Sequence, residues 1–127
     1  PRDLAEGNCC LVRRDNGEKT SVALSELADR IHGLLDEVQQ GLYAKAKRNL
    51  DEHTYAAYSL EEAKELQERN GGFIKTMWCG DLQCELDMKE KAGMSSRCIP
   101  FAQEKLGEVC ACCGKPAKHM IYWGVAY

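Results

Sequence analysis

The stretch VCACCGKPAKH, residues 109–119, places three of the chain's eight cysteines within four positions. An earlier stretch, WCGDLQC, residues 78–84, contains two more. The earlier pair is spaced C-x4-C, the later stretch contains a C-x2-C pair, and 25 residues separate the two pairs. Pairs of this kind form tight turns that bring four thiolates around one structural zinc ion. The predicted zinc ligands are Cys79, Cys84, Cys110 and Cys113.

The third cysteine of the later stretch leaves the fourth ligand open. Neighbouring Cys112 and Cys113 would be strained if both bound one metal ion, and the commoner C-x2-C spacing favours Cys113, with Cys112 as the alternative. Gly80 and Gly114 stand where such turns need small residues close to sulfur. His119 is near enough in sequence to replace a cysteine, although a lone histidine in a strand is more often structural.

Disulfides, a redox pair and unbound thiols are the competing interpretations of the cysteines. An even number would suit a disulfide framework in a secreted chain, but the N-terminus has no secretory pattern, so metal binding is favoured. A thioredoxin-like pair at CACC needs the start of a helix, which the glycine and proline that follow would break. Cys9, Cys10 and Cys98 have no partner at a useful spacing, and we interpret them as small buried hydrophobes.

Composition indicates a folded protein that does not cross a membrane. The 127 residues are 44% hydrophobic and 29% charged, which is typical of globular domains. No apolar run approaches the roughly 20 residues of a transmembrane helix. The net charge of −3 argues against a dedicated nucleic-acid coat. We expect a cytoplasmic protein, and Pro1 in place of Met suggests a processed chain or a fragment of a longer one.

The first part of the chain has the pattern of a hairpin followed by a long helix. Residues 10–13 and 19–23 can pair as strands across the turn sequence DNG. From Leu24 to about Leu50, apolar residues recur every three or four positions, which predicts a helix with one apolar face. Such a face needs more sheet than two strands provide. Its partners lie either in the second part or upstream of the chain, and we favour the upstream location.

The second part alternates short helices and strands. The segment DEHTYAAY indicates a break, after which Ser59 and Glu62 form a capping box that opens a helix ending at the sequence NGG. FIKTMW and AKHMIYWGVAY predict strands, SSRCIPF an extended segment, and CELDMKEKAG a short helix ending at Gly93. We therefore predict an α+β fold, with a small mixed α/β zinc-binding domain preceded by the hairpin and long helix.

Six motifs occur in order along the chain: PRDL, VRRDNGEK, WCGDLQCE, SSRCIPF, CCGKPAK and the terminal VAY. In this order they resemble the C-terminal part of prolyl-tRNA synthetases, of the archaeal/eukaryotic type that some bacteria also carry. The resemblance covers essentially the whole chain, and the ordered set is more specific than any single motif.

The resemblance implies two domains and a set of functional residues. Residues 1–50 would be the C-terminal portion of a truncated α/β anticodon-binding domain, and residues 51–127 a zinc-binding domain. The carboxylate of the terminal Tyr127 would reach towards the catalytic domain, and Arg13 and Arg14 are candidate tRNA contacts. The family's zinc ligands fall on Cys79, Cys84, Cys110 and Cys113, while some relatives use C-x-C for the second pair.

The family's chemistry is ATP-dependent activation of proline and its transfer to tRNA. The resemblance implies a class II, homodimeric parent whose ATP site lies in a catalytic domain absent from this chain. We therefore expect no catalytic or cofactor-binding residue here and a fragment that is inactive alone. The residues themselves contain no G-x-S-x-G, phosphate loop or dinucleotide fingerprint. A zinc ion held by four thiolates has no open position, so its role would be structural.

Two other functions compete with this interpretation. The first is a free-standing zinc-binding adaptor for protein or nucleic acid. The second is a thiol oxidoreductase that uses the crowded cysteines as a reversible pair.

Overall fold

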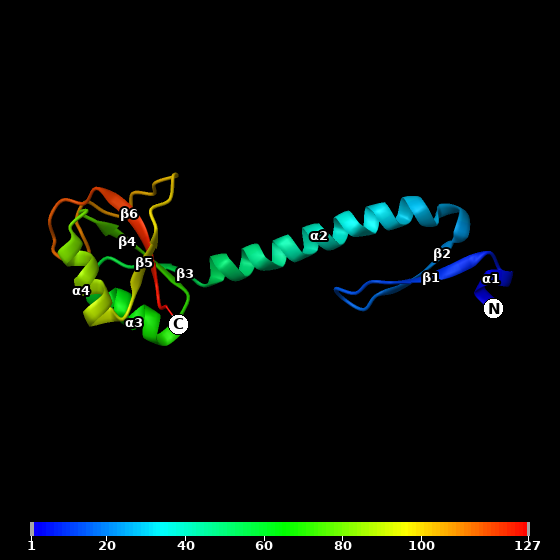
Figure 1. Ribbon diagram of the computed structural model, residues 1–127, viewed down its shortest axis with the longest axis horizontal. Helices are drawn as coiled ribbons and strands as arrows, with labels where there is room; N and C mark the ends of the chain where they lie inside the picture. The colour runs from blue at the N-terminus through cyan, green and yellow to red at the C-terminus, as the bar shows by residue number, and fades with distance from the viewer. Residues whose placement is uncertain (1, 127) are drawn as a thin grey trace. The chain divides into compact units, whose positions relative to one another are not determined.

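The computed structural model describes residues 2–126. The chain divides into two compact units, Pro1–Arg48 and Asn49–Tyr127, called unit 1 and unit 2 below. Figure 1 shows the elements of each. None of the helices in the described part combines the length and apolar character needed to cross a membrane.

Unit 1 contains the predicted hairpin and the start of the long helix. After helix α1 (Arg2–Ala5), strands β1 (Asn8–Val12) and β2 (Lys19–Ala23) pair antiparallel. Their turn is closed by a bond of 2.8 Å from the backbone N–H of Arg13 to the carbonyl of Glu18. A 3-10 turn (Leu24–Glu26) leads into α2 (Leu27–Glu52), so the predicted helix is confirmed with small shifts at both ends.

The apolar face of α2 is present, but its side chains remain at least partly exposed to solvent. No described residue of this helix is buried, and Leu35 and Leu42 expose 61% and 53% of their surface. Val22, on β2, is the single buried hydrophobic residue among the described residues of unit 1. Two strands offer too little surface to enclose a helix of this length. Unit 1 therefore has an amphipathic helix but no core of its own.

Unit 2 is built on a four-stranded sheet. Its elements in order are β3 (Thr54–Ala56), α3 (Leu60–Asn70), β4 (Phe73–Trp78), α4 (Leu82–Ala92), β5 (Ser95–Cys98) and β6 (His119–Gly124). The spatial order is β3-β4-β6-β5, with β3 parallel to β4 and the other pairs antiparallel. The sequence predicted a break where β3 lies, because three residues give no periodicity and their pairing with β4 is long-range.

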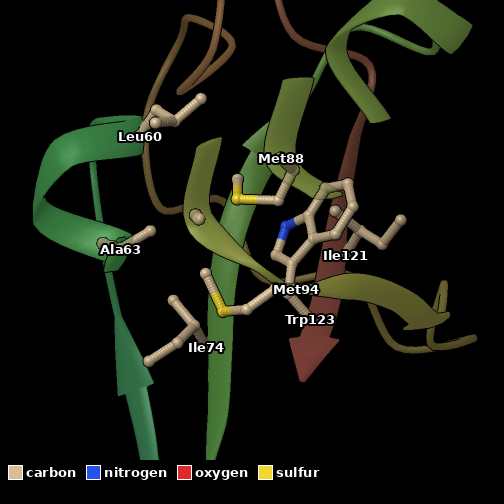
Figure 2. Close-up of a cluster of buried hydrophobic side chains, with 9 residues drawn as sticks. Leu60, Ala63, Ile74, Met88, Met94, Ile121 and Trp123 are labelled. Atoms are coloured by element: carbon tan, nitrogen blue, oxygen red, sulfur yellow. The ribbon is translucent and has the colours of Figure 1, made fainter. Parts of the chain in front are cut away.

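The core of unit 2 lies between the sheet and its two helices. Side chains from α3 and α4 meet Ile74 of β4 and Trp123 of β6, and Figure 2 shows them pointing towards one another. The indole N–H of Trp123 donates to the buried hydroxyl of Thr76 at 2.9 Å, which satisfies both polar groups away from water. The buried members are Ala57, Leu60, Ala63, Ile74, Met88, Ala92, Met94, Ile121 and Trp123.

Local signals fix the ends of both helices in unit 2. The Ser59 hydroxyl accepts a hydrogen bond from the backbone N–H of Glu62 at 3.1 Å, which confirms the predicted cap. The Glu62 carboxylate accepts from the N–H of Tyr58 at 2.8 Å, one residue earlier than in a standard capping box. Asp81 caps α4, and the helix ends before Gly93 as predicted. The mixed α+β class expected from the sequence is therefore present.

Candidate metal centre

The first cysteine pair bridges the end of a strand and the start of a helix. Cys79 follows directly after β4, and Cys84 lies in the first turn of α4. Between them, the Asp81 carboxylate accepts from the N–H of Gln83 at 3.0 Å and fixes the start of the helix. The indole N–H of Trp78 donates to the carbonyl of Asp81 at 3.2 Å. These bonds hold the chain in the sharp turn that aims both sulfur atoms the same way.

The second pair lies in a tight turn within the connection from β5 to β6. The N–H of Gly114 donates to the carbonyl of Cys110 at 2.9 Å, and the N–H of Cys110 donates to Lys115 at 2.8 Å. An isolated antiparallel bridge between Val109 and Pro116 closes the base of the turn. The segment forms no helix, so the helix start that a thioredoxin-like pair requires is absent here.

The glycines of the two turns are needed for a reason other than the predicted one. Gly80 and Gly114 have φ of +88° and +70°, a region that side chains with a Cβ rarely adopt. A Cβ on Gly114 would meet no described atom within 4 Å, and one on Gly80 would lie 3.6 Å from Lys118. The backbone conformation is therefore sufficient to account for both glycines.

Backbone hydrogen bonds bring the two turns together. Ala111, in the second turn, donates its N–H to the carbonyl of Met77 on β4 at 3.0 Å. Its carbonyl accepts from the N–H of Leu60, at the start of α3, also at 3.0 Å. The N–H of Lys118 donates to the carbonyl of Trp78 at 2.8 Å. Residues distant in sequence are thus joined by main-chain groups, which no side-chain motif could have predicted.

The four predicted ligands come together in one cluster. The sulfur atoms of Cys79, Cys84, Cys110 and Cys113 all lie within 4.8 Å of one another. The Cys79 sulfur lies 3.7 Å from those of Cys84 and Cys113. A tetrahedral zinc ion with Zn–S bonds of about 2.3 Å separates its sulfurs by about 3.8 Å. The spacing and the donor set therefore fit a metal ion that prefers thiolates.

Burial makes this cluster unfavourable for uncompensated charge. Cys79, Cys84 and Cys110 are buried, and Cys113 is exposed. Burial raises the pKa of Cys79 and of Cys84. At Cys110 burial also raises the pKa, but backbone hydrogen bonds from Cys112, Cys113 and Cys79 outweigh it and lower the pKa to about 7. A divalent cation among the sulfurs would offset the cost of ionising the other thiols.

Positive side chains lie beside the cluster. Lys115 and Lys118 line the same hollow as Cys79, and the Lys115 ammonium lies 3.9 Å from the Asp81 carboxylate. Four thiolates around a divalent ion keep a net charge of about −2, which nearby cations stabilise. The two lysines therefore have the charge opposite to that of the thiolate cluster with a metal ion bound.

Cys112 lies outside the sulfur cluster. Its thiol donates to the carbonyl of Cys84 at 3.4 Å, and it packs against the core of unit 2. Burial raises its pKa to about 12. The structure therefore gathers Cys113, and not Cys112, with the other three cysteines.

The remaining cysteines correct one prediction and leave the disulfide alternative without support. All eight cysteines are free. The expectation that Cys9, Cys10 and Cys98 are buried is wrong for the last two, which are exposed, while Cys9 is half-buried. Cys10 lies on a hairpin without a covering layer, and Cys98 ends β5 at the edge of its sheet. Sequence alone does not reveal which strands remain uncovered.

The histidines are not members of the cluster. His119 begins β6 and is exposed, and it is absent from the sulfur group. His53 contacts the carbonyl of Asn49 through its ring nitrogen Nδ1 at 2.8 Å, while His32 is exposed on α2. None of the ion pairs found among residues 2–126 involves a histidine.

The two arginines predicted as tRNA contacts differ sharply. Arg13 leaves only 15% of its side chain exposed, and it forms ion pairs with Asp15 at 2.9 Å and Glu37 at 3.0 Å. Arg14 is exposed, and none of the ion pairs found among residues 2–126 involves it. Arg14 is thus the freer of the two for a phosphate. Tyr127, predicted to contact the catalytic domain, lies outside the described residues.

Comparison with known proteins gives one consistent result. A family model described as "Prolyl-tRNA synthetase, C-terminal" matches residues 60–127. A proline–tRNA ligase from Clostridium novyi (strain NT) is 51% identical over all of this chain and 27% of its own length. A proline–tRNA ligase from Lachnospira eligens is 50% identical over 26% of its length, and proline–tRNA ligase 2 from Bacillus thuringiensis (strain Al Hakam) is 50% identical over 27%. The chain thus spans about a quarter of these relatives.

Proposed function

Because the chain belongs to the family of prolyl-tRNA synthetase C-terminal regions, we propose that it is the C-terminal part of a proline–tRNA ligase. The parent enzyme would use ATP to attach proline to its tRNA. The single observation that carries this proposal is the sequence identity of about 50% to proline–tRNA ligases in alignments that cover the whole chain. Similarity over the full length, including the hairpin and α2, favours a synthetase region over a free-standing zinc adaptor.

We assign residues 1–50 to the end of the anticodon-binding domain and residues 51–127 to a zinc-binding domain. The uncovered apolar side chains of α2 support the first assignment, because a helix of this kind belongs to a larger packed layer. The separate core and sulfur cluster of unit 2 support the second. The parent would be of the archaeal/eukaryotic type found in some bacteria, a class II homodimer that binds ATP and works in the cytoplasm.

The metal in this proposal is zinc, held for structure. Cys79, Cys84 and Cys110 with Cys113 would bind it as four thiolates, leaving no open position for a substrate or water. The 3.7 Å sulfur separations support zinc over a looser arrangement of thiols. This site would fix the two turns of unit 2, so its contribution to charging would be stability rather than chemistry.

Contacts with tRNA would come from unit 1. Arg14 is the first candidate, because its guanidinium is exposed and forms none of the ion pairs found among residues 2–126, which suits it to a phosphate. Arg13 would have to leave Asp15 and Glu37 first. We also propose that the carboxylate of Tyr127 contacts the catalytic part of the parent.

Charging assays test the enzymatic assignment. The full-length parent should show proline-dependent ATP–pyrophosphate exchange and should charge the tRNA for proline, whereas this chain alone should do neither. Clear activity of the chain alone, or a parent that charges another amino acid, would overturn the proposal.

Metal analysis of a matched pair of variants tests the site. The wild-type chain and Cys112→Ser should each bind one zinc ion, and Cys113→Ser should bind zinc far more weakly, because it removes one thiolate ligand. Loss of zinc in Cys112→Ser with retention in Cys113→Ser would reassign the fourth ligand. A wild-type chain without zinc would refute the metal centre.

A further inference from the structure

The connection from β5 to β6 presents one apolar side chain entirely to solvent. Phe101 is 110% exposed, more than any other large hydrophobic residue among residues 2–126, and its neighbour Ile99 is 47% exposed. In Figure 1 this connection, drawn in yellow to orange, projects beyond the strands of unit 2. A single exposed phenylalanine is unremarkable on a mobile loop. Its meaning depends on whether the loop is held in place.

Side-chain hydrogen bonds hold this loop on both sides of its apolar tip. The Gln103 amide nitrogen donates to the carbonyls of Pro100 at 2.7 Å and Met120 at 3.2 Å. Its oxygen accepts from the N–H of Met120 at 2.6 Å, so one side chain bonds both backbone groups of a β6 residue. Lys75 of β4 adds an ion pair with Glu104 at 2.6 Å. Phe101 is therefore displayed by a fixed backbone rather than free to fold back.

A fixed, exposed apolar group loses little conformational freedom when it is buried by a partner. Because little conformational entropy is lost on binding, a preorganised anchor binds more tightly than a flexible one. Aromatic residues that enter a pocket supply much of the energy of interfaces that contain them. Phe101 has the composition and rigidity of such an anchor, and with Ile99, two residues earlier and 47% exposed, it is called the apolar knob below.

We propose that the apolar knob docks in an apolar pocket on the part of the parent polypeptide that precedes this chain. The inference rests on the proposed function, which makes this chain a region of a longer synthetase. The relatives align with all of this chain over only 27% of their length, so most of the polypeptide lies outside it. A covalently attached partner has an effective concentration on the order of millimolar, at which a small contact is sufficient.

Two other partners fit the knob less well. A separate protein needs an interface that buries roughly 1,200–2,000 Å², far more than two side chains provide. RNA is not favoured by charge, because residues 99–109 contain a single lysine, together with Glu108 and with Glu104, which is paired with Lys75. That lysine, Lys105, is already paired with Glu108 at 2.5 Å. Docking within one polypeptide is the arrangement that the size and charge of the knob support.

Photo-crosslinking in the full-length parent identifies the partner directly. The photoreactive residue p-benzoylphenylalanine, placed at position 101, should form crosslinks within the same polypeptide, to peptides that precede this chain. The same residue at position 105, an exposed lysine of the same loop, should give at most a tenth of that yield. Crosslinks to a second copy, crosslinks to added tRNA, or equal yields at both positions would overturn the proposal.

Hydrogen exchange of Phe101→Ser measures the energetic consequence. In the full-length parent the amides of residues 99–105 should lose protection roughly tenfold, equivalent to about 1.4 kcal/mol. The same variant of the 127-residue chain should exchange as the wild type does, because the side chain touches little there. Equal exchange of wild type and variant in the parent would refute docking. Proline charging is measured on the same samples. If the parent charges tRNA with proline but Phe101→Ser does not change hydrogen exchange, only the docking of the knob is rejected and the proposed function stands.

Discussion

Unit 2 and unit 1 bury their apolar residues to very different extents. Unit 2 encloses nine buried residues between its sheet and two helices, and it adds the sulfur cluster beside them. Unit 1 buries Val22 while the described residues of its long helix remain at least partly exposed. The difference teaches that one sequence can contain a unit with an enclosed core and a unit whose long helix has no buried residue among those described. Each of the following predictions challenges or refines that contrast.

Removing the proposed zinc ion should have one of the two largest effects, and only on unit 2. At free zinc 1,000-fold above the dissociation constant, a bound ion stabilises the folded state by about 4 kcal/mol. A chelator should therefore lower the free energy of unfolding of unit 2 by about that amount. Both tryptophans, Trp78 and Trp123, lie in unit 2, so their fluorescence in urea reports this unit alone. An unchanged midpoint after complete removal of zinc would show that the core suffices without the ion.

Matched truncations in the two units compare their packing directly. Met88→Ala removes a fully buried side chain and should cost about 2–5 kcal/mol, measured by urea unfolding followed by far-UV circular dichroism, which reports both units. Leu35→Ala removes a side chain that is mostly exposed in this chain and should change stability by about 0.5 kcal/mol or less. A large loss of unfolding free energy in Leu35→Ala would show that a core surrounds α2, and it would refute the difference in packing between the two units.

Loss of the Ser59 cap should have an intermediate effect. Ser59→Ala leaves the N–H of Glu62 without its acceptor and should destabilise unit 2 by about 1 kcal/mol. Ser25→Ala is the control, because the 3-10 turn that contains it has no side-chain cap. Equal costs for the two serines, with urea unfolding followed by far-UV circular dichroism so that both units are reported, would argue that the cap contributes nothing specific.

The smallest effect concerns pH and the hairpin of unit 1. The hydrogen bond from Arg13 lowers the pKa of Asp15 below 3.8. The stabilisation from this ionised carboxylate is therefore present above pH 3.8 and is lost as pH falls through the lower folded value. An NMR titration of the Asp15 carboxyl should show this lowered pKa, and Arg13→Gln should return it towards 3.8. A pKa indifferent to Arg13 would contradict the assignment of its cause.

Features with a local signal were predictable from the sequence. The hairpin turn, the long helix, the Ser59 cap and the spacing within each cysteine pair depend on residues close together in the chain. Features that depend on distant backbone groups were not. Strand β3 and the contacts of Ala111 arise from main-chain pairing, which side-chain types do not encode. The exposure of Cys10 and Cys98 was mispredicted because burial depends on which layer covers a strand.

Arg13 illustrates the same limit at a candidate site. Arg13 was named as a candidate tRNA contact, and the structure shows it paired with Asp15 and with Glu37, which is 24 residues away. The sequence shows that Arg13 is positively charged, but it does not show which carboxylates pair with it. Arg14, its neighbour, has the same chemistry and no such ion pair among the described residues, so adjacent identical residues have different electrostatic surroundings.

Ala111 joins β4, α3 and the second cysteine turn through its N–H and carbonyl groups, without using its methyl group. A mutational scan of unit 2 would consequently rate position 111 as tolerant to most residues of modest size. Proline would be the exception, because it has no N–H to give to Met77. A mutational scan that replaces only side chains would thus classify this position as unimportant, although its backbone connects three parts of the domain.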